Sequence, residues 1–151
     1  MKNRKTDPAL DSLGLLILEV FRLNGRLLAS GDALVSEFGL TSARWQVLGA
    51  IAMASQAEPV SRLARSVGAH RQGVQRIVNE LARDGLVSYR ENPHHRRAQL
   101  VVLTESGAGV YAAAMKKRGP WIKSLAKDLH VDEILAATQV LERLRDRLDR
   151  Q

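Results

Sequence analysis

The 151-residue sequence contains no cysteine, so disulfide bonds and thiol-based sensing are both excluded. It also lacks an apolar run long enough to cross a membrane, because Glu19, Arg22 and Arg26 interrupt the leucine-rich segment near the N-terminus. No small-residue cleavage site follows Leu18, so a signal peptide is not expected. Internal repeats and low-complexity tracts are absent as well. We therefore expect a cytoplasmic protein with no membrane partner.

Enzyme signatures are also missing, apart from two short matches without their usual context. Residues 107–112 match the pattern G-x-G-x-x-A, but a hairpin is predicted before them and only helices after them, whereas a dinucleotide fold needs a parallel strand–helix–strand unit. Residues 124–127 match S-x-x-K, but the partner motifs of that chemistry do not occur. No set of serine, histidine and carboxylate residues replaces them. We expect neither catalysis nor a cofactor.

The four histidines are too few and too scattered for a metal site. His94 and His95 are neighbours in a predicted turn, and no cysteine or carboxylate cluster lies near them in the sequence to complete a tetrahedral zinc site. His70 and His130 stand alone. We expect no metal, and we interpret the histidines as solvated or facing a phosphate. Because histidine gains charge in mild acid, the turn would then become more cationic as the pH falls.

The charge balance is strongly basic. Lys and Arg number 23 against 16 Asp and Glu, which gives a net charge of +7. Such a balance suggests a nucleic acid or another anionic surface as partner, without distinguishing the two. The length fits one domain, or one domain with dimerisation arms, so residues 1–151 are predicted to form a single domain. Residues 1–6 resemble a disordered basic leader.

Residues 71–84 carry the clearest functional pattern. At 100° per residue, one helical face is apolar, with Val74, Ile77, Val78 and Leu81. The opposite face has no acidic residue and consists of Arg71, Gln72, Gln75, Arg76, Asn79 and Arg83. Arginine, glutamine and asparagine side chains match the donors and acceptors of base edges in the major groove of DNA. This face is therefore a candidate recognition surface.

The residues before this helix predict a helix-turn-helix. Val60, Leu63, Ala64 and Val67 repeat with helical spacing after Pro59, and Gly68 suits the turn that follows. An ordinary pair of helices with a solvated polar face is the alternative interpretation.

A β-hairpin predicted after the second helix favours the functional reading. Residues 86–91 and 98–103 are β-prone, and Asn92–Pro93 marks a turn between them. The tip of this hairpin carries His94, His95, Arg96 and Arg97. Such a cationic tip can reach a phosphate backbone or the minor groove, so the hairpin is interpreted as the wing of a winged helix.

Long helices are predicted at both ends of the chain. Asp7 and Pro8 form a strong helix start, and that helix is expected to end at Gly31, with a short helix over residues 32–38 after it. Its leucines cover more than one face, so part of it is expected to bury against another chain. Near the C-terminus, Gly119–Pro120 is expected to break or kink a helix that starts after Thr104. The last helix, over residues 132–150, has an apolar seam that contains Ile134, Ala137, Leu141, Leu144 and Leu148.

Together these residues resemble the MarR family of bacterial transcriptional regulators. Residues 71–78, Leu81 and residues 85–87 are similar to its recognition helix, and Asn92–Pro93, residues 96–98 and residues 103–104 are similar to its wing. The flanking helices follow the family's order. The sequence departs from the pattern in two ways: His94 and His95 replace residues that are usually acidic, and His70 replaces a common Thr or Ser cap.

The resemblance implies a mainly α fold with a small β-hairpin wing, in which residues 41–104 form the DNA-binding lobe. It also implies a homodimer built from residues 7–31 and 120–150, and a pocket for small aromatic or anionic effectors. Trp45 is a candidate for lining that pocket, although core packing is the favoured interpretation of this residue.

The predicted function is therefore sequence-specific DNA binding by a transcriptional repressor that recognises a pseudo-palindromic operator. Arg71, Gln72, Gln75 and Arg76 are the candidates for major-groove and adjacent phosphate contacts, and Arg96 and Arg97 for contacts of the wing. A non-specific architectural DNA-binding protein is the alternative. It would need the cationic surface but not the glutamine-bearing helix face.

Overall fold

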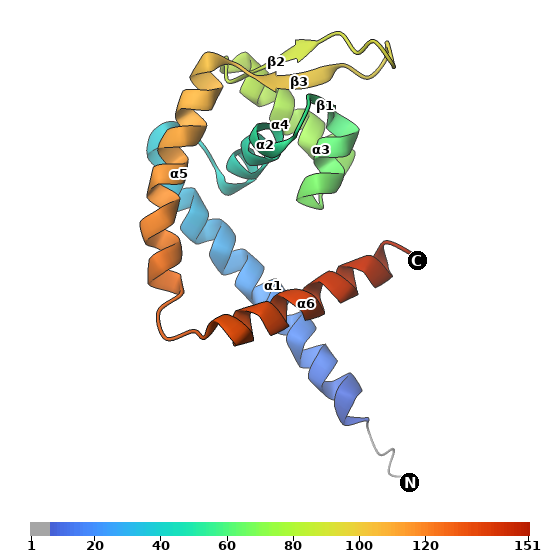
Figure 1. The fold of residues 1–151 in the computed structure, drawn as a ribbon, viewed down its shortest axis with the longest axis vertical. Helices are drawn as coiled ribbons and strands as arrows, with labels where there is room; N and C mark the ends of the chain where they lie inside the picture. The colour runs from blue at the N-terminus through green and yellow to red at the C-terminus, as the bar shows by residue number, and fades with distance from the viewer. Residues whose placement is uncertain (1–6) are drawn as a thin grey trace. The chain divides into compact units, whose positions relative to one another are not determined.

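Helices make up most of the computed structural model, which describes residues 7–151 (Figure 1). The predicted fold class, mainly α with a small β-hairpin wing, is confirmed. The expected basic leader lies outside the described residues. The elements are α1 (Pro8–Val35), a short 3₁₀ helix (Ser36–Phe38), α2 (Ser42–Met53), β1 (Glu58–Pro59), α3 (Val60–Val67), α4 (Arg71–Arg83), β2 (Val87–Arg90), β3 (Leu100–Leu103), α5 (Glu105–Leu125) and α6 (Val131–Leu148).

The described chain divides into two units. The first ends at Lys117 and holds the helix-turn-helix, the sheet and the hydrophobic core, whereas the second covers Arg118–Gln151 and contains α6. None of the helices within residues 7–151 is long and apolar enough to cross a membrane.

Helix α1 begins as predicted, but its predicted end is wrong. The side chain of Asp7 accepts a hydrogen bond from the Ala9 amide, and Pro8 follows at the first helical position. The helix then continues through Gly31 to Val35, and the short helix expected over residues 32–38 is its last turn plus a 3₁₀ turn. Gly31 does not stop the helix, because its missing side chain instead makes room for Ser42.

Two hydrogen bonds hold the N-terminus of α2 against α1 at this point. The Ser42 hydroxyl donates to the Leu28 carbonyl at 2.8 Å, and the Ser42 amide donates to the Asp32 carboxylate at 2.6 Å. A Cβ on Gly31 would overlap the Ser42 hydroxyl. Thr41 caps α2, accepting from the Arg44 amide at 3.2 Å. The glycine therefore serves close packing between helices.

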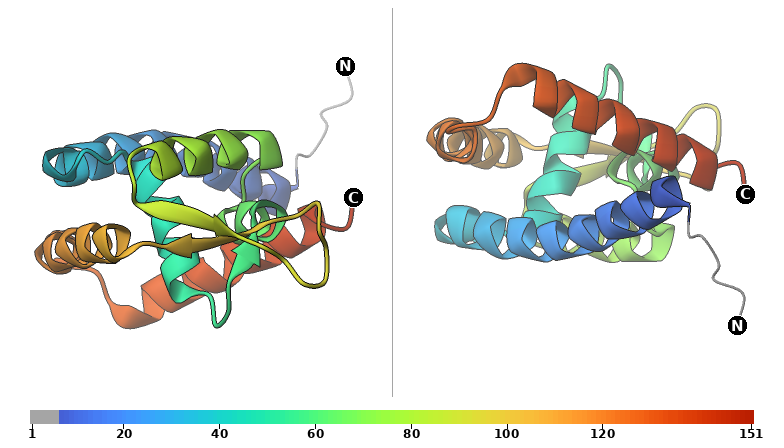
Figure 2. Two further views of the ribbon diagram at one scale, coloured as in Figure 1. Left: turned by 90° about the horizontal axis from the view of Figure 1, so that it is seen from above. Right: turned by 90° about the horizontal axis from the view of Figure 1, so that it is seen from below.

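A three-stranded antiparallel sheet in the order β1-β3-β2 completes the lobe. Tyr89 in β2 lies opposite Val101 in β3, and Pro59 in β1 lies opposite Leu100. Strand β1 was not predicted, because a strand of two residues has no detectable alternation and residues 56–59 look like a linker. Figures 1 and 2 show the loop between β2 and β3, in yellow, projecting from the end of the sheet.

The core joins the helix-turn-helix to the sheet and to α5. Most of the apolar residues predicted from helical spacing are buried, among them Leu63 in α3 and Val74, Val78 and Leu81 in α4, whereas Val67 and Ile77 are only partly buried at the edge of the core. Val101 from β3 and Ala114 from α5 complete the same cluster. This packing fixes which face of α4 points outward.

Helix α5 starts at a tight backbone contact. The Thr104 hydroxyl donates to the Gly85 carbonyl at 2.6 Å and accepts from the Gly107 amide at 3.0 Å. The Thr104 amide donates to the Leu86 carbonyl at 3.1 Å. A Cβ on Gly107 would overlap that same carbonyl oxygen. The first glycine of the G-x-G motif, Gly107, therefore serves packing of α5 against the chain between α4 and β2.

Gly119–Pro120 was expected to break or kink the helix, and the break is wrong. Helix α5 runs through both residues to Leu125. A proline inside a helix removes one backbone hydrogen bond, and the turns on either side can hold the helix together. The chain instead leaves the helix after Leu125, and Asp128 takes a positive φ of 64°. Helix α6 then begins with the His130 amide donating to the Glu133 carboxylate at 3.0 Å.

Candidate nucleic-acid interface

A glycine turn sets the angle between α3 and α4. Gly68 has a φ of 66°, which glycine adopts at little cost, and the Ala69 amide donates to the Ala64 carbonyl at 3.0 Å to close the end of α3. Helix α4 then starts at Arg71 without a side-chain cap from His70. The helix-turn-helix predicted from the sequence is therefore present, and His70 is not a substitute for the usual cap.

Helix α4 presents its predicted polar face to solvent. Arg71, Gln72 and Arg76 are exposed, while the apolar stripe is turned into the core. Within the part of the chain that the structure describes, neither Arg71 nor Gln72 has an ion pair or a side-chain hydrogen bond. Both amide functions of Gln72 are therefore free to bind a ligand.

The face is not as free of carboxylates as its sequence indicates. Glu80 lies one turn after Arg76, and its carboxylate is 3.9 Å from the Arg76 guanidinium. On the helical wheel Glu80 falls at the border of the polar face, so the sequence count left it out. Arg76 is 79% exposed at its side chain, and the exposed pair holds it weakly. Arg76 can therefore still turn towards a phosphate.

Gln75 is not free, because three side chains bond to one another beside the wing. Its Nε2 donates to the Tyr89 hydroxyl at 2.9 Å and to the Asn79 carbonyl oxygen at 3.0 Å. The Tyr89 hydroxyl in turn donates to the same Asn79 oxygen at 2.6 Å. This Gln75–Asn79–Tyr89 triad ties the polar face of α4 to strand β2.

The wing is held by a single buried asparagine. Asn92 is only 6% exposed, and its side chain donates to the Ala98 carbonyl at 2.9 Å and accepts from the His94 amide at 3.0 Å. These two bonds close the base of the loop from both sides. The side chains of the tip are thereby displayed outward.

The tip of the wing is fully accessible. His94, His95, Arg96 and Arg97 are all exposed. Within residues 7–151, no ion pair neutralises either arginine. The pairing expected of an acidic wing is therefore replaced by an unopposed positive charge.

The recognition helix and the wing share a polar cavity of about 240 Å³. Arg71 lines it from α4 and Arg97 from the wing, together with the Gln75–Asn79–Tyr89 triad. The structure therefore brings together three of the predicted residues, Arg71, Gln75 and Arg97, while Arg96 lies beside Pro93 at the other side of the tip.

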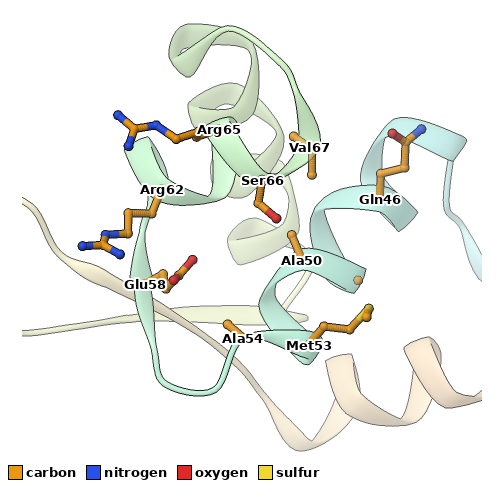
Figure 3. Close-up of a pocket in the computed structure, with 10 residues that line it drawn as sticks. Gln46, Ala50, Met53, Ala54, Glu58, Arg62, Arg65, Ser66 and Val67 are labelled. Atoms are coloured by element: carbon orange, nitrogen blue, oxygen red, sulfur yellow. The ribbon is translucent and has the colours of Figure 1, made fainter. Parts of the chain in front are cut away.

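A larger open cavity of about 660 Å³ lies between α2, β1 and α3 (Figure 3). Ala50 of α2 faces Ser66 of α3, while the side chains of Arg62 and Arg65 extend outward from the rim. Trp45 is not among its lining residues. This tryptophan is half-buried and packs against the hydrophobic core, which agrees with the favoured interpretation.

Within residues 7–151, no group of three or more His, Asp or Glu side chains lies close enough together to bind a metal ion. The surface is cationic at the wing tip and at the start of α4, and α4 also carries two glutamines on its outer face.

Known proteins share this combination of a helix-turn-helix and a wing. A sequence profile of the MarR family matches residues 38–98, which include the helix-turn-helix, strand β2 and the loop at the tip of the wing. An uncharacterised Mycobacterium tuberculosis protein, Rv2011c, is 41% identical over 107 residues, which cover 71% of this chain and 73% of that protein.

The chain belongs to the MarR family. The transcriptional activatory protein BadR of Rhodopseudomonas palustris is 26% identical over 147 residues, which cover 95% of this chain and 84% of BadR. A mutant of E. coli MarR complexed with operator DNA has a TM-score of 0.74 and 26% identity, over 92% of this chain and 99% of that one. The chain is therefore a DNA-binding transcriptional regulator of the MarR type, and its family and fold are those of regulators rather than enzymes.

Tyr89 is the residue of this MarR-type surface that the sequence did not reveal. It stands in a strand pattern and reads as an ordinary half-buried strand residue, yet its hydroxyl bonds two residues of the recognition helix. The only signal was a tyrosine on the strand that follows the helix, since tyrosine needs a partner for its hydroxyl when buried.

Proposed function

We propose that this MarR-family protein binds a pseudo-palindromic operator as a homodimer and represses transcription from it. The observation that carries the proposal is the exposure of Arg71 and Gln72 on α4 and of Arg96 and Arg97 on the wing, none of which has an ion pair or a side-chain hydrogen bond within residues 7–151. Glutamine supplies base readout, and arginine supplies phosphate attraction. A regulator of this kind acts where the chromosome is, in the cytoplasm.

The roles of the six residues follow from their surroundings. Gln72 and Gln75 read base edges in the major groove, and Arg71 and Arg76 contact bases or the adjacent phosphates. Arg96 and Arg97 contact the backbone or the minor groove from the wing, where positive charge is favoured. The winged lobe covers residues 41–104 in this assignment.

Dimerisation is proposed from apolar side chains that the single chain leaves in water. Leu10, Leu15 and Phe21 in α1 are 64%, 66% and 71% exposed, and α6 exposes Ile134, Leu141 and Leu148. Exposed apolar patches of this kind mark protein interfaces. Residues 7–31 and 120–150 would form that interface, and two lobes related by a two-fold axis would then meet half-sites about 10 bp apart.

Repression follows from occupancy, because a dimer that covers two successive major grooves excludes other proteins from the same DNA. BadR, which is similar along most of the chain, is named an activatory protein, so activation is the contrary outcome. Release by a small aromatic or anionic effector is part of the proposal. Trp45, which packs against the hydrophobic core, stays a candidate for lining the effector pocket.

The test is a binding titration at two salt concentrations against duplexes selected by the protein from genomic DNA and against random duplexes. We expect the selected duplex to bind at least about 1,000-fold more tightly at physiological salt. An architectural protein would bind both alike and lose affinity with salt equally on both. Transcription in vitro from a promoter that carries the selected site then separates repression from activation.

A further inference from the structure

We propose that the Gln75–Asn79–Tyr89 triad makes Gln75 an acceptor-only reader of DNA, which recognises adenine or cytosine without distinguishing them. This inference rests on the proposed function, since it needs α4 to lie in the major groove. It concerns the chemistry that Gln75 offers there.

The argument begins with the hydrogen atoms of one amide group. A glutamine side chain has two N–H donors and one carbonyl oxygen. Both donors of Gln75 are in use, one on the Tyr89 hydroxyl at 2.9 Å and the other on the Asn79 carbonyl oxygen at 3.0 Å. Only the carbonyl oxygen of Gln75 stays available to a ligand.

The orientation of that amide is coupled to those of its neighbours. The Tyr89 hydroxyl has one proton and donates it to the Asn79 oxygen at 2.6 Å, so it accepts from Gln75. Turning the Gln75 amide alone would place its carbonyl oxygen against the Asn79 carbonyl oxygen, and two acceptors would then face each other; the reverse orientation requires the Asn79 amide to turn with it. In the structure, Gln75 lies with its nitrogen inward.

This orientation conflicts with the usual pairing of glutamine with adenine. In that pair, the glutamine nitrogen donates to N7 while its oxygen accepts from the N6 amine. Gln75 can make the second bond but not the first. Cytosine offers an N4 amine at the equivalent place, whereas guanine and thymine offer the carbonyl oxygens O6 and O4 there. Gln75 therefore separates adenine and cytosine from guanine and thymine.

Gln72 provides the internal contrast on the same helix. It lies about one helical turn before Gln75, is exposed, and has no side-chain hydrogen bond within the described residues. Both functions of its amide are free, so Gln72 can make the bidentate adenine pair. The two glutamines of α4 would thus read by different rules.

The experiment selects duplexes from a random pool with the wild-type protein and with Gln75→Ala, and finds the base position whose preference the substitution flattens. At that position we expect adenine and cytosine to bind within about threefold of each other and about 3–10-fold more tightly than guanine or thymine, the range of one net hydrogen bond. Replacing the adenine by 7-deazaadenine, which lacks N7, should change wild-type affinity by less than about twofold.

The decisive variant is Tyr89→Phe, which removes the hydroxyl and frees one Gln75 N–H. We expect this variant to prefer adenine over cytosine by about tenfold, and to lose that preference with 7-deazaadenine. Tyr111→Phe, which removes the hydroxyl of the chain's other tyrosine, is the matched control and should keep the wild-type pattern. Thermal unfolding of both variants verifies that the fold is kept.

Two kinds of failure are distinguishable. If no sequence is enriched above random DNA, the proposed function falls, and this inference falls with it. If a sequence is enriched but 7-deazaadenine weakens wild-type binding tenfold, or guanine or thymine is preferred, or Gln75→Ala flattens no position, the inference alone is overturned.

Discussion

The two glutamines of α4 have the same chemistry and different surroundings. Gln72 points into solvent, whereas Gln75 is bonded to Asn79 and Tyr89. Arg97 lies across the shared cavity from Arg71 and carries an unopposed charge. Base readout and phosphate attraction are therefore assigned to different residues, and single substitutions can separate them.

We expect Gln72→Ala to weaken binding to the cognate site by about 1–3 kcal/mol and to relax discrimination there. Arg97→Ala should instead weaken cognate and random DNA by similar factors and lower the salt slope by about one unit, because a phosphate contact carries no sequence information. Titrations at several salt concentrations measure both quantities. A loss of sequence preference in Arg97→Ala, with preference kept in Gln72→Ala, would mean that the two roles are reversed.

Helical spacing was sufficient to predict which residues face outward on α4 and which are buried, because a 3.6-residue period is local. It could not predict the Gln75–Tyr89 bond, since these residues are 14 positions apart and meet only through the fold. The Arg76–Glu80 pair, by contrast, is four positions apart on one helix and within reach of helical spacing; it was missed because Glu80 lies at the border of the polar face. Contacts across elements decide how free a predicted site residue is.

At the scale of elements, a glycine can be required for two reasons, to end a helix or to allow close packing, and the sequence alone does not separate them. Gly68 and Gly85 have positive φ angles and follow the ends of helices, as was predicted for Gly68. Gly31 and Gly107 lie within helices and are needed because another backbone or side chain comes too close for a Cβ. A glycine in a sequence does not tell which of these two reasons applies, so the end of α1 was misplaced by four residues while the start, with a clear cap, was correct.

Gly107→Ala should destabilise the fold by about 2–4 kcal/mol, because its methyl group would overlap the Leu86 carbonyl oxygen and backbone cannot easily give way. Gly109→Ala, two residues later on the same helix with open space around it, should be neutral or stabilise by up to about 1 kcal/mol through helix propensity. Chemical denaturation compares the two. Equal stability of both variants would show that α5 can shift away from Leu86.

For the whole molecule, the exposed apolar residues of α1 and α6 predict a homodimer. We expect Leu141→Asp combined with Leu144→Asp to give monomers or insoluble protein, because charges would enter the proposed apolar seam of α6. The control Gln139→Asp with Arg143→Gln changes the net charge by the same amount on the opposite side of the helix and should stay dimeric. Light scattering measures the mass. A soluble Leu141→Asp, Leu144→Asp variant with native dimer mass would refute the role of this seam.

A footprint on the selected operator tests the same assembly from the side of the DNA. Two recognition helices related by a two-fold axis should protect two half-sites about 10 bp apart, centre to centre. Protection of one half-site alone at saturation would contradict a symmetric reader.

Because of the contact at Leu86, the recognition helix α4 and the wing cannot move independently of each other. The end of α4, the end of β3 and the first turn of α5 meet there through the Thr104 bonds to Gly85 and Leu86 and the packing of Gly107. Helix and wing must therefore turn as one body. A signal that reaches the DNA through α5 would change the distance and angle between two such bodies, not the shape of either. Regulation would then act on the fit to operator spacing, and an isolated half-site would not sense it.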